Sequence, residues 1–273
     1  MRDDEEQLDE DEDEDNRTRQ YTIERSGFAC RVLEMGIIAY GAHTYEELKT
    51  IAPDRVYAFD MNVRMERLRR HVASLNDIPK MLAFEGLPIT SPNGNLGRIA
   101  WIEVCIDLAL ARLTSVRDIA LFLVVETFEL DLKPHQVSFN KLQGLGLPEA
   151  VLDDVKALAD VAIDLRGERN RRVHRGEMRK HGGADHVMIQ SASVWEAMGM
   201  PPGNIDALPS AENHGETYSL SVRCRAIADE LNVEFREVAN EVMDATIRVI
   251  DSLSEHFEPR WKEKLSRSKL GLS

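Results

Sequence analysis

Residues 99–125, IAWIEVCIDLALARLTSVRDIALFLVV, carry the strongest structural signal in this 273-residue chain. The second half of the stretch, extended to about residue 130, is apolar nearly all round, which predicts a buried central helix. Thr114 or Ser115 can cap that helix, so we expect two helices in succession. In the first half, apolar side chains recur every three or four residues, as on one face of a helix: Ile99, Ile102, Ile106, Ala109 and Leu113.

Helical patterns continue on both sides of this stretch. Alternating runs with tight turns, which would predict strands, are nearly absent. The chain also lacks the glycine-rich phosphate-binding loops G-x-G-x-x-G and G-x-x-x-x-G-K. We therefore expect an all-α fold, with further helices in four segments: residues 20–52 (with a capping box at Thr44 to Glu47), 54–76, 148–175 and 218–257.

The last of these segments has a seven-residue repeat. Cys224, Leu231, Val238 and Ala245 form one series, and Ala228, Phe235, Val242 and Val249 form a second beside it. Such spacing predicts a long helix, broken or continuous, with one face against a core.

Glycine and proline clusters interrupt the helical patterns at residues 77–97, 131–148 and 181–217. The first is the best candidate boundary, and the third is a long loop with a short helix around residues 194–198. We expect a disordered acidic tail (1–16), an N-terminal helical region (17–96) and a helical bundle (97–273) with the long loop at 181–217.

The negative charge of the chain is concentrated at its N-terminus. The chain has 48 acidic and 34 basic residues, and residues 2–15 contain eleven of the acids and one of the bases. The remaining 37 acidic and 33 basic residues leave the rest of the chain near neutral. The tail is interpreted as a solubilising segment or as a decoy that competes with nucleic acid for a basic site.

Cysteine usage and the N-terminus point to the cytoplasm. Cys30, Cys105 and Cys224 are far apart and odd in number, which argues against a disulfide framework or a zinc cluster. The N-terminus lacks the basic and apolar regions of a secretory signal, and the longest apolar run, residues 119–125, is too short for a membrane span. His181 and His186 match no strong metal signature, so we expect no cofactor.

The basic stretch 166–175, RGERNRRVHR, carries the most distinctive chemistry. The apolar stripe of the preceding helix (Val155, Leu158, Ala162 and Leu165) continues onto Arg169, which must then meet an anion, a carboxylate or a water-filled cleft. Asn170 and His174 are four residues apart and share an adjacent helix face.

Residues 166–180 contain seven Lys or Arg and two acids. The resulting local charge of +5 favours the binding of a polyanion. Histidine can exchange protons with ribose and leaving-group oxygens, and arginine stabilises phosphoryl charge. Two copies of the helix meeting at a twofold axis would bring both groups into one cleft. The expected nucleic-acid-binding residues are Arg166, Arg171, Arg172, Arg175, Arg179 and Lys180.

Arg169-Asn170-x-x-x-His174 resembles the R-x(4–6)-H motif of the HEPN superfamily, in which a polar residue often follows the arginine. The resemblance implies a helical bundle, here with additional N-terminal helices, that forms a homodimer around the motif helices. It implies a metal-independent endoribonuclease acting on RNA in defence, toxin–antitoxin or stress systems, with an antitoxin or regulatory protein as a further partner. Arg169 and His174 would be catalytic, and Asn170 would support them.

Three alternatives stay open from the sequence. The first is a non-catalytic HEPN-like module that binds RNA, a nucleotide or a protein. The second is a helical adaptor whose basic patch is incidental. In the third, Arg169 and His174 are ordinary residues near a helix C-terminus, where cations complement the helix dipole.

Overall fold

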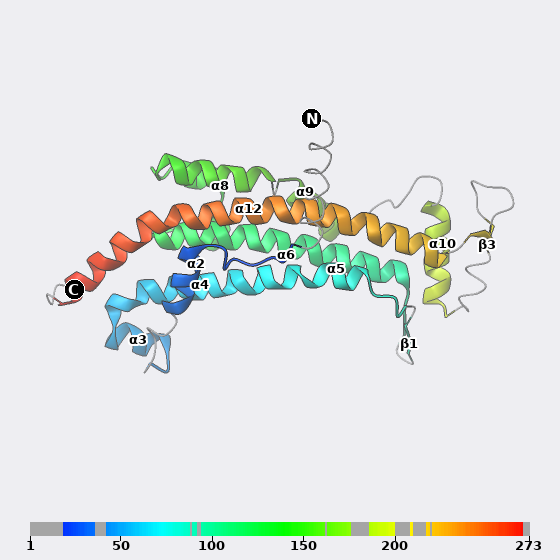
Figure 1. The fold of residues 1–273 in the computed structure, drawn as a ribbon, viewed down its shortest axis with the longest axis horizontal. Coiled ribbons are helices and arrows are strands. Elements are labelled where there is room, and N and C mark those ends of the chain that lie inside the picture. The colour runs from blue at the N-terminus through cyan, green and yellow to red at the C-terminus, as the bar shows by residue number, and fades with distance from the viewer. Residues whose placement is uncertain are drawn as a thin grey trace, which may run out of the picture. The chain divides into compact units, whose positions relative to one another are not determined.

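The protein is all-α, as the sequence predicts (Figure 1). The computed structural model describes residues 19–35, 42–87, 89–91, 94–161, 163–175, 186–199, 208–209, 217–218 and 220–269. Its α-helices are α2 (Gly27–Glu34), α3 (Tyr45–Ile51), α4 (Pro53–Leu75), α5 (Asp77–Leu82), α6 (Arg98–Thr127), α7 (Phe139–Gln143), α8 (Glu149–Val161), α9 (Ile163–Arg175), α10 (His186–Ala197) and α12 (Leu220–Lys269).

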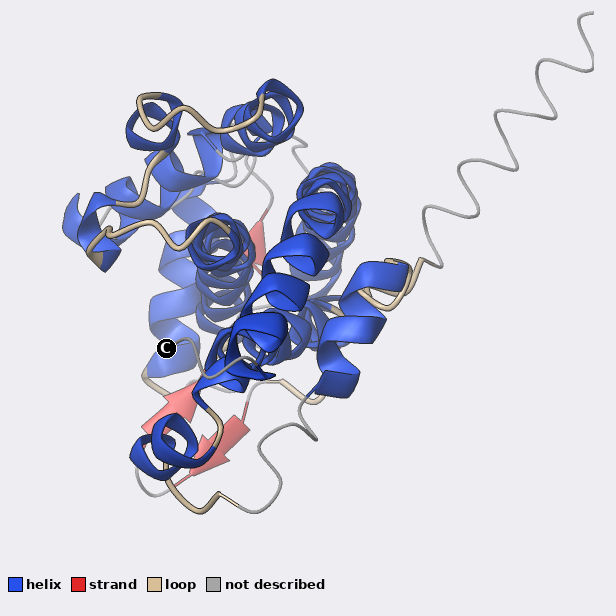
Figure 2. Cartoon of the chain, turned by 90° about the vertical axis from the view of Figure 1, so that its left-hand side faces the viewer, coloured by secondary structure: helices blue, strands red, loops and turns tan. Residues whose placement is uncertain are grey.

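The described strands form two small antiparallel ribbons, which the sequence did not predict (Figure 2). In the first, β1 (Ile89–Ser91) pairs with β2 (Gly94–Leu96), and Thr90 lies opposite Asn95. In the second, β3 (Leu208–Pro209) pairs with β4 (Thr217–Tyr218). Neither ribbon has enough strands to form a core of its own.

The expectation of two helices within residues 99–130 was wrong, because α6 continues from Arg98 to Thr127 without interruption. Thr114, one of the two proposed caps, lies inside the helix and is 1% exposed. Leu113 and Val116 beside it are also buried, so burial of this face outweighs the capping preference of the hydroxyl residues.

Several other segments also differ from expectation. The segment 148–175 contains two helices, α8 and α9, and Ala162 between them lies outside the described residues. The expected loop at 131–148 contains a 3₁₀ turn (Pro134–Gln136) and α7. The helix expected over residues 218–257, α12, instead continues through Pro259 to Lys269.

The seven-residue repeat of α12 does face the interior. All its members except Val238 are buried: Cys224, Ala228, Leu231, Phe235, Val242, Ala245 and Val249. The predicted cap of α3 is also present, since the Thr44 hydroxyl accepts a hydrogen bond from the Glu47 N–H at 3.1 Å. Glu47 in turn accepts one from the His43 N–H at 2.8 Å.

The chain forms two compact units, each drawn from separate segments of the sequence. The bundle unit comprises the described residues within the ranges 19–75, 112–165 and 239–273. Its core centres on the buried Phe257 of α12, which stacks on Tyr57 of α4 at 5.1 Å and meets Phe28 of α2 edge-on at 5.5 Å. The Tyr57 hydroxyl donates to the Thr127 carbonyl at 2.8 Å, which joins α4 to the end of α6.

The ribbon unit comprises residues 76–111 and 166–238 of the described part of the chain. It contains α5, α9, α10, both ribbons and the first halves of α6 and α12. The carboxylate of Glu196 on α10 is fully buried and accepts from the Arg98 backbone N–H at 2.7 Å and from Arg98 Nη1 at 2.8 Å. Glu196 thereby caps α6 and ties α10 to it.

No helix among the described residues combines the length and the apolar character needed to cross a bilayer.

Candidate functional site

Arg172 anchors α9 to α6 inside the ribbon unit. Its Nε donates to Asp107 Oδ1 at 2.6 Å, and its Nη2 forms an ion pair with Glu103. The Arg172 side chain is 8% exposed, and Glu103 is 12% exposed. Burial alone would lower the pKa of Arg172, but the bonds to Glu103 and Asp107 outweigh it and raise that pKa. Hydrogen bonds between a guanidinium group and carboxylates are charge-assisted and directional. The contact of Arg172 with Glu103 and Asp107 therefore fixes the rotation of α9 about its own axis.

The position of Arg172 corrects one expectation. The sequence placed Arg172 with the other arginines on an exposed rim, whereas its charge is taken up by two carboxylates of the same chain. Adding Glu103 and Asp107 to the count for residues 166–180 lowers the local charge from +5 to +3. The basic character of the site is therefore weaker than α9 alone indicates.

The first two residues of the Arg-Asn-His motif lie in contact. Arg169 is partly buried, and its Nη2 donates to Oδ1 of the exposed Asn170 at 3.4 Å. Arg169 is four residues after the partly buried Leu165 and three before Arg172, so it belongs to the α9 face that turns towards α6. His174 is part of α9, but its side chain lies outside the described residues, so its place beside Asn170 stays a prediction.

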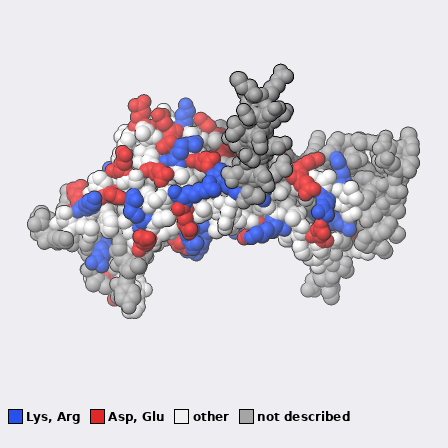
Figure 3. All heavy atoms as spheres, in the orientation of Figure 1, with Lys and Arg blue, Asp and Glu red and all other residues white. Residues whose placement is uncertain are grey.

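The remaining predicted nucleic-acid-binding residues fall into two groups. Arg166 and Arg171 are exposed on α9. Arg175 ends α9 with its side chain outside the described residues, and Arg179 and Lys180 lie outside them altogether. On the face shown in Figure 3, basic and acidic side chains are interspersed.

Neither of the two histidines considered as a metal site has a described side chain. His181 lies outside the described residues, and His186 begins α10 with its side chain outside them. Elsewhere in the described part of the chain, no group of His, Cys, Asp and Glu has the arrangement of a metal site.

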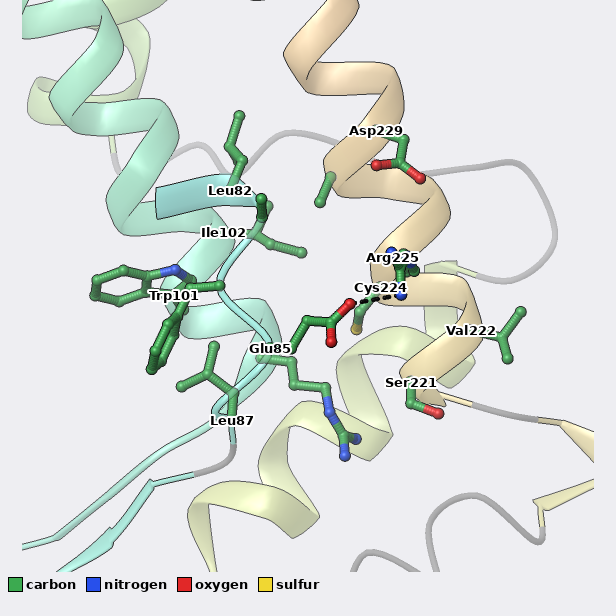
Figure 4. Close-up of a pocket in the computed structure, with 14 residues that line it drawn as sticks. Leu82, Glu85, Leu87, Trp101, Ile102, Ser221, Val222, Cys224, Arg225 and Asp229 are labelled. Atoms are coloured by element: carbon green, nitrogen blue, oxygen red, sulfur yellow. Dashed lines mark ion pairs between the residues drawn. The ribbon is translucent and has the colours of Figure 1, made fainter. Parts of the chain in front are cut away.

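A pocket of about 390 Å³ lies in the ribbon unit. It is lined by the first turn of α6, which directly precedes Glu103, one of the two partners of Arg172. Leu82, Ile102, Cys224 and Ala228 give it apolar walls. Figure 4 shows the ion pair between Glu85 and Arg225, at 2.6 Å, running from the segment after α5 to α12. Sequence reasoning missed this pocket, because its walls come from three segments far apart in the chain and none carries a ligand-binding motif.

No known protein family, curated protein or solved structure matches the chain. The resemblance to HEPN proteins therefore stays a prediction from the motif at Arg169 to His174. Function has to be inferred from α9, its contacts with α6 and the chemistry of its side chains.

Proposed function

We propose that this protein is a metal-independent endoribonuclease of the HEPN type, with an active site completed by α9 of a second copy. The role that fits best is RNA cleavage in a defence, toxin–antitoxin or stress response. The observation that carries the proposal is the anchored, basic helix α9, on which Arg169 and Asn170 lie in contact. Because the buried Arg172 supplies the anchor, Arg166, Asn170 and Arg171 are left exposed on the helix.

Each residue of the motif has a defined task in RNA cleavage. His174 accepts the proton of the ribose 2′-hydroxyl, whose oxygen attacks the adjacent phosphorus. The bond from phosphorus to the 5′-oxygen breaks, which leaves a 2′,3′-cyclic phosphate, and the 5′-oxygen receives a proton. Arg169 stabilises the charge that develops on the phosphoryl oxygens. The contact with Asn170 Oδ1 orients the Arg169 guanidinium for this task.

Two copies of α9 fit this chemistry better than one. Five residues separate Arg169 from His174, which is about 140° around an ideal helix, so one copy directs these positions partly apart. At a twofold axis, each copy faces the other with the same surface. One His174 then serves as the base and the second copy's His174 as the acid.

RNA cleavage in the presence of a metal chelator tests the proposal. We expect Arg169→Ala and His174→Ala each to slow cleavage of a single-stranded RNA at least about 100-fold, the usual scale for removing a general acid–base or charge-stabilising group. Lys156→Ala, which removes an exposed cation from α8 that has no place in the proposed site, is the control and should retain most of the activity. Cleavage by both motif variants at the wild-type rate would exclude the proposed site.

The alternative is a non-catalytic HEPN-like helical module that binds RNA, a nucleotide or a protein partner. The observation in its favour is that Glu103 and Asp107 offset part of the positive charge around α9. Filter binding of the same RNA separates the two functions. A module of this kind binds without cleaving, and Arg169→Ala changes only its affinity.

A further inference from the structure

The arginines of α4, in the bundle unit, are mostly neutralised by nearby carboxylates. Arg64 pairs with Glu126 at 3.0 Å, and Arg69 and Arg70 both pair with Glu66, at 2.7 and 3.3 Å. These are ordinary ion pairs of a solvated helix face, and they contribute little to stability.

Arg67 of α4 and Arg112 of α6 are different. Among the described residues, neither forms an ion pair with a carboxylate. Arg112 instead places its Nη1 3.3 Å from Nδ1 of His71. A guanidinium group has only N–H donors, so Nδ1 must be the acceptor in this contact. The tautomer that fits this contact is the one with its proton on Nε2.

Cations surround this imidazole. Burial lowers the pKa of His71, and the charges of Arg112, Arg67 and Arg70 lower it further. The carboxylate of Glu66, on the same helix, is already held by Arg69 and Arg70. The charged groups acting on His71 within the described residues thus leave an excess of positive charge around a ring whose pKa is lowered.

We propose that Arg67, His71 and Arg112 form a binding site for a phosphate group. All three side chains carry N–H groups that can donate to a phosphate oxygen. Arg67 and His71 are four residues apart on α4, so they share one helix face, and Arg112 approaches that face from α6. A phosphate oxyanion accepts several such bonds at once and relieves the repulsion among the arginines.

Arg70 completes the rim of the site. Its side chain is 71% exposed, and its one ion pair within the described residues is with Glu66, so it can turn towards a bound anion at little cost. The phosphate can belong to a free anion or to the backbone of an RNA, and the chemistry of recognition is the same. The site lies in the bundle unit and does not depend on the proposed chemistry of α9.

The His71 ring reports on the site directly. We expect inorganic phosphate to raise the pKa of His71 by about one unit, because a nearby anion favours the charged imidazole. The pKa is measured by proton NMR of the imidazole ring, whose signals are assigned with the His71→Gln variant. Sodium chloride at the same ionic strength should raise it much less. Arg112→Gln and Arg67→Gln should each abolish or reduce the effect of phosphate, whereas Arg69→Gln, which removes an arginine already paired with Glu66, should not.

Two results would overturn the site. One is an equal response of His71 to phosphate and chloride, which means screening alone. The other is an undiminished response in both Arg112→Gln and Arg67→Gln. If a single-stranded oligoribonucleotide, tested with the cleavage-deficient His174→Ala variant, shifts His71 at a lower concentration than inorganic phosphate does, the site holds an RNA backbone. If inorganic phosphate acts at the lower concentration, the site holds a small anion.

Discussion

Each of the two units is stabilised internally by a different kind of contact. In the bundle unit, rings from α2, α4 and α12 pack around Phe257, which is fully buried. In the ribbon unit, two buried or nearly buried ion pairs position the elements: Glu196 with Arg98, and Glu103 with Arg172. Packing is tolerant of direction, whereas an ion pair fixes two groups at one distance and angle.

The difference matters because the candidate active residues all belong to the ribbon unit. A helix held by directional bonds keeps its side chains at fixed angles, which catalysis requires. The same bonds are also vulnerable, because loss of one partner leaves the other charge buried and unpaired. The ribbon unit should therefore respond to changes of charge and the bundle unit to changes of volume.

The largest effect is expected in the bundle unit. Phe257→Ala should lower the free energy of unfolding by about 4 kcal/mol, since it removes a ring that contacts Phe28, Tyr57 and Trp261. Urea unfolding followed by circular dichroism measures the change. Phe257→Leu, which keeps much of the volume, should cost only about 1 kcal/mol. An equal loss in both variants would mean that volume does not decide stability there.

The next largest effect is expected in the ribbon unit. Glu196→Ala should cost about 3 kcal/mol by the same measurement, because it removes the cap of α6 and leaves Arg98, 15% exposed, without its carboxylate. Glu196→Gln keeps an acceptor for the Arg98 backbone N–H and should cost less.

The pair Glu85 and Arg225 provides the control for Glu196. Both side chains are more than 70% exposed. Glu85→Ala should therefore change stability by no more than about 0.5 kcal/mol. If Glu85→Ala were as damaging as Glu196→Ala, burial would not distinguish the two pairs.

The smallest effect is a pH dependence at His71 in the bundle unit. Its pKa in the folded protein is lowered from 6.5, by burial first and then by the neighbouring arginines. The unfolded chain therefore binds this proton more readily, and the free energy of unfolding should fall as the pH drops below about 6.5. Above that pH the contribution of His71 is constant.

His71→Gln isolates this contribution from the titration of carboxylates. The variant keeps an acceptor for Arg112, so the difference between wild type and variant should change with pH between about 6.5 and the lowered pKa. The series is run in phosphate-free buffer. A difference that stays flat from pH 7.5 to pH 5 would mean that His71 does not resist protonation.

The sequence predicted the elements of the fold where their periodicity reflects burial. The repeat in α12 did so, since Phe235, Val242 and Val249 are buried at seven-residue intervals. The continuity of α6 through Thr114 was not predictable from local preference, because the favourable burial of that turn comes from distant segments.

Only the local part of the candidate site could be predicted from the sequence. The spacing of Arg169, Asn170 and His174 is local, and the structure describes the first two in contact. The partners of Arg172 lie 65 and 69 residues earlier in the chain, so no pattern around residue 172 could distinguish the anchor from an exposed arginine. A charge count along the sequence therefore overestimates the net charge around a helix wherever oppositely charged partners come from distant segments of the chain.

Glu196 also has a consequence for evolution. A methyl group at Gly97 would lie 2.7 Å from Glu196 Oε2, closer than such atoms approach, so any side chain there displaces the buried carboxylate. Substitution at Gly97 is therefore tolerated only where the residue at position 196 changes with it. A search for distant relatives can therefore use this pair as a signature: a Gly-Arg dipeptide that opens a long apolar helix, with a glutamate about a hundred residues later, in which the glycine varies only when the glutamate does.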